Sequence, residues 1–123
     1  MIEFNTKEEN LHFHGVIDID PKELATMLED SSQQKQIQLI DVRQPDEFNG
    51  DLGHIPGATL MVLDTLPDLV DKVDKDKTVV FVCRSGGRSA RAAAYFQSLG
   101  YKNVFNLKGG MLLWSELHLE TEA

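Results

Sequence analysis

The chain has 123 residues, 41% hydrophobic and 26% charged, which is enough for one domain with a single core. Its formal net charge of −8 argues against general binding of nucleic acid or of anionic membrane surfaces. The first residues lack the pattern of a secretory signal, no apolar run approaches a membrane span, and the single cysteine excludes an internal disulfide. We therefore expect a cytoplasmic protein.

Short β-rich runs alternate with helical patterns along the chain, which predicts an α/β layered fold. The first expected strand is GVIDID (15–20), and a helix follows it, with Asp20 as its N-cap and Pro21 at its first position. The polar run SSQQKQ (31–36) is expected to be a connector, and IQLIDV (37–42) the next strand.

The middle of the chain holds the run that is expected to form the centre of the sheet. Residues 43–58 contain two prolines and three glycines, which predicts a short helix and then a long turn-rich loop. Residues 59–63 are expected to form a short strand, and the apolar spacing over 66–73 predicts a third helix. The run TVVFVC (78–83) is nearly all apolar, as in a central parallel strand buried on both faces.

The last third of the sequence predicts a helix, a strand and a second helix. An alanine-rich helix is expected from about Ser89 to Gly100, which suits a helix end. Residues 103–107 predict the last strand, and the following helix is expected to turn Leu113 or Trp114 inward.

The stretch FVCRSGGRSARAA (81–93) contains the only cysteine, Cys83, at the predicted carboxyl end of a parallel strand and just before a helix. Open α/β sheets bind ligands at this edge, and the first N–H groups of a helix favour an anion. Arg84, Arg88 and Arg91 fall there without an intervening acid, although the chain as a whole is acidic. This local reversal of charge indicates an anion site.

Two interpretations of Cys83 compete. A cysteine that follows an apolar run is commonly an inert core residue. The residues after it favour a nucleophile, because Gly86 and Gly87 let successive N–H groups converge, and a thiolate is stabilised at the start of a helix. We therefore predict a nucleophilic cysteine. Neither a P-loop nor a dinucleotide-binding glycine pattern is present in the sequence.

Four motifs, in this order, resemble the rhodanese-like sulfurtransferase family in its single-domain form. They are LIDVRQPDEF (39–48), GHIPGA (53–58), CRSGGRS (83–89) and NVFNLKGGMLLW (103–114). The resemblance covers roughly residues 16–116 and implies a five-stranded parallel sheet flanked by helices on both faces.

The same resemblance implies a domain organisation. We expect a loosely ordered N-terminal segment over residues 1–15 and a rhodanese-like domain over 16–118. A C-terminal tail, 119–123, is also expected to be loosely held.

The resemblance also implies that Cys83 carries a persulfide sulfur between a donor and an acceptor, with no metal or organic cofactor. Arg84 and Arg88 would attract an anionic donor, and the Ser89 hydroxyl would hydrogen-bond the cysteine sulfur. The backbone amides that would cradle the terminal sulfur belong to Arg84, Ser85, Gly86, Gly87, Arg88 and Ser89.

Residues of the first two motifs are candidates for a supporting role. Asp41 and Arg43 are expected beside the strand end that carries Cys83. Either Asp41 or Glu47 pairs with a loop arginine and holds the cradle in shape, or these charges form a surface pair contributing less than about 1 kcal/mol. We expect turn hydrogen bonds from His54 rather than general-base chemistry, because an ionised thiol has no proton to give up.

Loop length separates this chemistry from that of phosphatases and arsenate reductases with the same architecture. Those enzymes place five residues between cysteine and arginine, whereas four separate Cys83 from Arg88 here. Val82 also stands where such phosphatases usually have histidine. The shorter loop fits a single sulfur atom better than a tetrahedral oxyanion.

Three hypotheses about function follow. The first is a sulfurtransferase in which Cys83 takes sulfur from a small anionic donor such as thiosulfate and passes it to cyanide or a thiol by a ping-pong mechanism. The second is a sulfur-relay or persulfide-sensing module whose acceptor is a thioredoxin-like or other protein. The third is the phosphatase-like enzyme.

His12 and His14 share one face of an extended segment, but without further ligands they give little support to a metal site.

Overall fold

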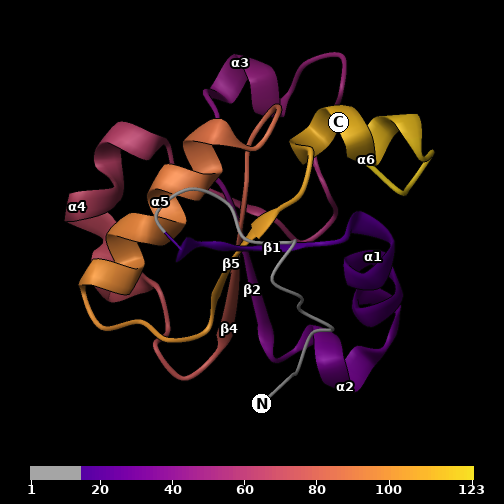
Figure 1. The fold of residues 1–123 in the computed structure, drawn as a ribbon. Helices are drawn as coiled ribbons and strands as arrows, with labels where there is room; N and C mark the ends of the chain where they lie inside the picture. Colours follow the sequence, from indigo (N-terminus) through magenta and orange to yellow (C-terminus); the bar gives the residue numbers. More distant parts are fainter. Residues whose placement is uncertain (1–14) are drawn as a thin grey trace.

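The computed structural model describes residues 15–123, and His12 and His14 lie outside them. Five parallel strands form one sheet in the order β1-β5-β4-β2-β3 (Figure 1). The predicted α/β class and five-stranded parallel sheet are thus confirmed. The strands are β1 (Ile17–Ile19), β2 (Ile37–Asp41), β3 (Thr59–Leu60), β4 (Thr78–Val82) and β5 (Val104–Leu107).

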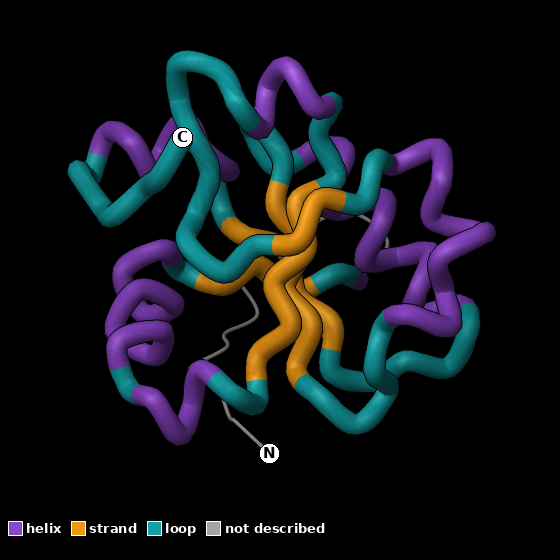
Figure 2. Tube along the Cα trace, turned by 180° about the vertical axis from the view of Figure 1, so that it is seen from behind, coloured by secondary structure: helices purple, strands orange, loops and turns teal. Residues whose placement is uncertain are grey.

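Helices cover both faces of this sheet. On one side of the strands in Figure 1 lie α4 and α5, and on the other lie α1 and α2; the view from behind in Figure 2 shows the same layers. The helices are α1 (Pro21–Glu29), α2 (Ser31–Gln34), α3 (Pro45–Phe48), α4 (Leu66–Leu69), α5 (Gly87–Ser98) and α6 (Gly110–Glu116), with 3-10 turns η3 (Leu63–Thr65) and η4 (Val70–Lys72) on either side of α4.

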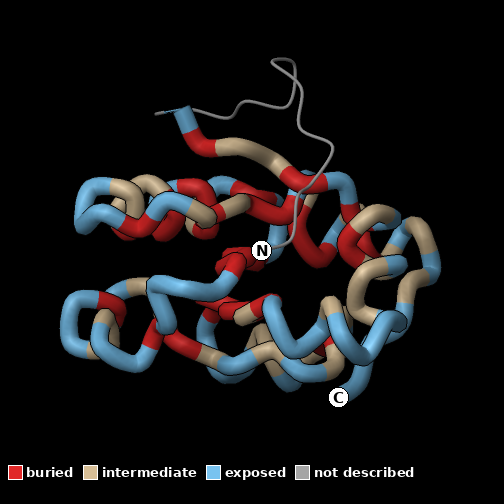
Figure 3. Tube along the Cα trace, turned by 90° about the horizontal axis from the view of Figure 1, so that it is seen from below, coloured by how far each residue is buried: buried red, intermediate tan, exposed pale blue. Residues whose placement is uncertain are grey.

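The central strand β4 is buried along its whole length, as predicted for TVVFVC. Because successive side chains of a strand point to opposite faces, Val79 and Phe81 pack in the cluster that contains α5 residues. Val80 and Val82 pack in the cluster that contains residues of α1 and α6. Figure 3 shows buried positions gathered between the helical layers. This burial on both sides accounts for an apolar run without alternation.

Three helix boundaries illustrate how local sequence signals operate. The Asp20 carboxylate accepts a hydrogen bond from the Lys22 N–H at 3.2 Å, and Pro21 is the first residue of α1, as predicted. The alanine-rich helix α5 begins at Gly87, two residues earlier than expected. Beyond its end, Gly100 adopts a left-handed backbone with φ of 94°.

Three segments differ from their predictions. The connector 31–36 contains the one-turn helix α2, because the Asp30 carboxylate accepts hydrogen bonds from the N–H groups of Ser32 and Gln33. The helix expected over 66–73 is instead α4 followed by a 3-10 turn, since apolar spacing of three residues suits either form. Within 59–63, the strand β3 is two residues long.

The C-terminal residues 119–122 contact the domain, which differs from the loosely held tail expected over 119–123. The His54 N–H donates to the Glu122 carbonyl at 2.9 Å, and the Glu122 N–H donates back to the His54 carbonyl at 2.8 Å. The Trp114 indole N–H donates to the Glu120 carbonyl at 2.9 Å. Leu119 packs against the core.

Within 15–123, no helix has the length and apolarity needed to cross a membrane.

Candidate active site

Cys83 lies between the end of β4 and the start of α5, and its side chain is buried. The Gly86 N–H donates to the Cys83 Sγ at 3.0 Å, and the Ser89 Oγ lies 3.2 Å from the same sulfur. Gly86 has φ of 109°, a left-handed conformation that favours glycine and that turns its N–H toward the sulfur. The loop therefore holds the sulfur at the amino end of a 12-residue helix.

The amino end of α6 supports the loop backbone. The Met111 N–H donates to the Cys83 carbonyl and the Leu112 N–H to the Arg84 carbonyl, both at 2.9 Å. A Cβ at Gly110 would lie 2.5 Å from each of these two carbonyl oxygens, so a side chain there would displace the loop. Sequence reasoning did not identify Gly110 as a site residue, although the paired glycines of NLKGGM were the signal for it.

A second residue that sequence reasoning missed, Asn106, lies beneath Ser89. The Ser89 hydroxyl donates to the Asn106 Oδ1, and the Asn106 Nδ2 donates to the Asp18 Oδ1 at 2.8 Å, which orients the amide. A hydroxyl has one proton to donate, so the Ser89 proton serves Asn106 or Cys83 but not both at once. The signal in the sequence was a polar residue between the apolar residues Phe105 and Leu107 of the predicted strand.

The loop residue Arg88 is bound to Glu47 of α3. The Arg88 Nη1 donates to the Glu47 Oε1 at 2.7 Å, and the Nη2 donates to the Oε2 at 2.8 Å. These hydrogen bonds, more than any other contact, lower the pKa of Glu47 to about 2 and raise the pKa of Arg88. Of the two carboxylates considered from sequence, Glu47 thus pairs with the loop arginine, and Asp41 does not.

The Asp41 carboxylate instead holds Arg43, and both side chains are almost completely buried, at 0% and 1% exposed. The Arg43 Nε and Nη2 donate to the two carboxylate oxygens at 2.9 and 2.8 Å, and Nη2 also donates to the Gly53 carbonyl at 2.7 Å. Parallel pairing of Asp41 with Val82 places this ion pair beside the strand end that carries Cys83. The surface-pair interpretation is therefore wrong for Asp41 and Arg43.

His54 makes hydrogen bonds within its own turn region. Its Nδ1 lies 2.9 Å from the Phe48 carbonyl oxygen, which can only accept, so this nitrogen carries the proton. The imidazole also stacks on the Phe48 ring with centroids 3.6 Å apart. On its other side, Nε2 lies 3.4 Å from the Glu122 Oε1. These contacts connect α3 with the C-terminal segment.

A hollow of about 320 Å³ opens beside the cysteine loop, residues 83–89. It carries an exposed cation, Arg84, and two exposed carboxylates, Asp46 and Asp51. Its lining residues are Arg43, Asp46, Glu47, Gly50, Asp51, Leu52 and Arg84. Ser85 and Gly87 are exposed in the loop, whereas Arg91 lines different hollows farther along α5. The structure thus brings two of the three clustered arginines, Arg84 and Arg88, to the cysteine loop.

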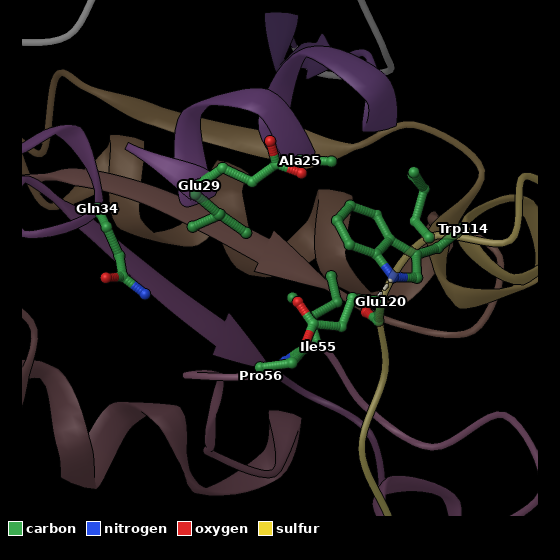
Figure 4. A pocket seen from close by; sticks show the side chains of 9 residues that line it. Ala25, Glu29, Gln34, Ile55, Pro56, Trp114 and Glu120 are labelled. Carbon is green, nitrogen blue, oxygen red and sulfur yellow. Dashed lines mark hydrogen bonds between the residues drawn. The ribbon is translucent and has the colours of Figure 1, made fainter. Parts of the chain in front are cut away.

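Trp114 is a core residue and lies apart from the hollow beside the cysteine loop. It lines a separate hollow of about 150 Å³ with Ile55, Pro56 and residues of α1, and Figure 4 shows the indole beside Glu120. Among residues 15–123, no cluster of three or more His, Cys, Asp or Glu side chains could hold a metal ion.

Comparison with known proteins agrees with this arrangement. Residues 20–117 match the family described as "Rhodanese-like domain". A sulfurtransferase from Allochromatium vinosum is 37% identical over 100 residues, 81% of this chain and 89% of that protein. The thiosulfate sulfurtransferase GlpE from Tolumonas auensis is 34% identical over 80 residues, 65% of this chain and 74% of that protein.

Solved structures show the same fold. The crystal structure of a rhodanese-like domain protein from Staphylococcus aureus has a TM-score of 0.72 at 34% identity, and the match covers 86% of this chain and 98% of that one. A protein of unknown function from Rhodopseudomonas palustris, described as a possible tyrosine phosphatase, has a TM-score of 0.75 at 26% identity, with 87% and 85% covered. With most of its length matched, the present chain belongs to the rhodanese-like domain family.

Proposed function

We propose that this chain is a sulfurtransferase that carries sulfane sulfur as a persulfide on Cys83. The donor is a small sulfur-containing anion such as thiosulfate, and the acceptor is cyanide or a thiol, including the thiol of a thioredoxin-like or other protein. The observation that carries the proposal is the Cys83 sulfur, held by the Gly86 N–H at 3.0 Å at the end of a central strand. The lone cysteine fits a reducing compartment, so we place the reaction in the cytoplasm.

The reaction consists of two sulfur transfers without net oxidation or reduction. The Cys83 thiolate attacks the outer sulfur of thiosulfate, a new S–S bond forms, and sulfite leaves with the electron pair of the old bond. Cyanide or a thiolate then attacks the outer sulfur of the persulfide, and the Cys83 thiolate is regenerated. Because the second cysteine needed for an internal disulfide is absent from the sequence, the acceptor must come from outside the chain.

Each loop group has a task in this proposal. The Gly86 N–H, whose nitrogen lies 3.0 Å from Sγ, stabilises negative charge on sulfur in both steps. The Ser89 hydroxyl, 3.2 Å from Sγ, adds to this when its proton turns from Asn106 to the sulfur. The exposed Arg84 attracts the anionic donor electrostatically. Arg88, partly exposed beside Glu47, positions the donor's sulfonate end.

Loop length favours sulfur transfer over phosphate chemistry on the same architecture. Four residues separate Cys83 from Arg88, which leaves a smaller loop than a tetrahedral phosphate needs. The thiosulfate sulfurtransferase among the relatives supports thiosulfate as the first donor to test.

Intact-mass measurement tests the proposal directly. We expect the reduced chain to gain one sulfur atom, about 32 Da, on incubation with thiosulfate and to lose it on addition of cyanide or a thiol. Cys83→Ser, which preserves the size of the side chain, should gain nothing. A chain that gains no mass but hydrolyses an aryl phosphate would contradict sulfur transfer.

The choice of acceptor is tested by the second half-reaction. The isolated persulfide is mixed with cyanide, with small thiols, and with a thioredoxin-like protein, and the decay of the added mass is followed. Turnover with cyanide and small thiols supports a broad sulfurtransferase. Decay with the protein acceptor alone would instead support the relay function.

A further inference from the structure

The C-terminal residues 119–122, here called the strap, lie beyond the end of the family match at residue 117. They are nevertheless bound to the domain at three points. Glu122 exchanges two backbone hydrogen bonds with His54, at 2.9 and 2.8 Å. The Glu120 carbonyl accepts from the Trp114 indole, and Leu119 packs on the core. Figure 4 shows Glu120 alongside Trp114 and Ile55.

The turn beneath the strap is built for its close approach. At Gly53, φ is 62°, and a Cβ would lie 2.7 Å from the Glu122 carbonyl oxygen. The Gly53 carbonyl in turn accepts from the buried Arg43 at 2.7 Å, and Arg43 binds Asp41 at the end of β2. The strap therefore lies on a segment that is connected by hydrogen bonds to the strand next to the one that leads into Cys83.

His54 extends this connection to α3. Its Nδ1–H donates to the Phe48 carbonyl at 2.9 Å, and its ring stacks on the Phe48 ring at 3.6 Å. Phe48 directly follows Glu47, and both belong to a helix of four residues, so a shift of one moves the other. Glu47 holds Arg88 through two hydrogen bonds.

We propose that the strap positions Arg88 at the cysteine loop by holding His54, Phe48 and Glu47 in place. This role rests on the proposed sulfurtransferase function. No residue of the strap contacts the reacting sulfur, so the strap is a positioning element. Without it, α3 loses the support of His54, and Glu47 no longer fixes the direction of the Arg88 guanidinium. A misdirected guanidinium binds the donor anion less well.

Two variants remove the strap contact in different ways. The chain that ends at Glu120 loses the pairing with His54 but keeps Leu119 and the bond to Trp114. Gly53→Ala introduces a methyl group against the Glu122 carbonyl. Gly57→Ala is the matched control for the latter, because Gly57 has φ of 89° in the same loop and open space around a Cβ. Both alanines strain a left-handed backbone, and only one meets the strap.

Steady-state kinetics with thiosulfate at a temperature where each variant is folded, as checked by circular dichroism, provides the test. We expect the shortened chain and Gly53→Ala to lose about three- to tenfold in kcat/KM, mainly through KM, and Gly57→Ala to lose less than about twofold. In a Glu47→Gln background the same strap changes should have little further effect, because the element they act through is already disconnected.

The outcomes separate the two proposals. A wild-type chain that forms no persulfide overturns the sulfurtransferase function and the strap's role with it. An active wild type with equal kinetics for Gly53→Ala and Gly57→Ala overturns the strap alone. A strap effect that persists undiminished with Glu47→Gln shows that the strap does not act through Glu47, which also overturns the proposal. If the shortened chain does not fold, the comparison of the two glycine variants decides.

Discussion

Two arginine–carboxylate pairs lie near the carboxyl edge of the sheet, and they differ in burial and in what they hold. Asp41 and Arg43 are enclosed, and Arg43 also binds the Gly53 carbonyl, which fixes the loop after α3. Glu47 and Arg88 retain 24% and 31% of their side-chain exposure and join α3 to the cysteine loop. The pairs use the same chemical groups, but water reaches only the second.

This difference in solvent access assigns them different tasks. An enclosed pair has lost its hydration, so removing one partner leaves a charge that neither water nor protein satisfies. A partly exposed pair is screened and contributes little to stability, but its arginine can exchange a carboxylate for another anion. We therefore expect changes at Asp41–Arg43 to affect folding and changes at Glu47–Arg88 to affect substrate use.

The largest effect is expected from Arg43→Met, which leaves the Asp41 carboxylate buried and unpaired. Its free energy of unfolding, measured in urea, should fall by about 3 to 5 kcal/mol. The double variant Asp41→Leu/Arg43→Met removes both charges and should recover at least half of that loss. A single variant within about 1 kcal/mol of wild type would contradict the structural role of this pair.

Arg88→Gln should show the opposite profile. Loss of a charged contact to the donor is expected to lower kcat/KM for thiosulfate by about 10- to 100-fold, while the free energy of unfolding changes by about 1 kcal/mol or less. Arg91→Gln is the matched control, because Arg91 lies on the same helix, is exposed, and lines other hollows. Equal kinetics for the two variants would refute a role for Arg88 in donor binding.

The smallest effect concerns acid stability. Folding lowers the pKa of Glu47 from 4.5 to about 2, chiefly through its hydrogen bonds to Arg88. The resulting stabilisation is therefore complete above about pH 4.5 and is lost as the pH falls through 2. Allowing for solvent screening, we expect the free energy of unfolding of wild type to exceed that of Glu47→Gln by about 1 kcal/mol at pH 6, and the gap to close near pH 2. Glu116→Gln, at an exposed carboxylate, serves as control; a gap that does not change with pH would argue against the pairing in solution.

Much of the fold was predictable because its signals are local. The apolar run of β4 predicted a central buried strand, and Asp20 with Pro21 predicted the start of α1. The order of strand, Cys83, glycines and helix predicted where the sulfur lies in the fold. Each of these follows from periodicity, capping or backbone freedom within a few residues, which the sequence displays directly.

The tertiary structure decided which residues distant in sequence are hydrogen-bond partners. The sequence offered both Asp41 and Glu47 to the loop arginine, and only the packing of α3 showed that Arg88 meets a residue 41 positions away. Asn106 and Asp18 are 88 positions apart and meet because β1 and β5 are neighbours. Residues 119–123 were expected to be loosely held because they end the chain, and only the tertiary structure shows Glu122 paired with His54.

By itself, then, the sequence determined the class of fold, the position of the cysteine loop and the family to compare it with. The tertiary structure decided which charge each arginine meets, what lies beneath Ser89, and that the last residues cover the turn at His54. The physical reason is that hydrogen-bond partners between segments depend on strand order and on close approach. Both are properties of the packed chain, and no short stretch of residues encodes them alone.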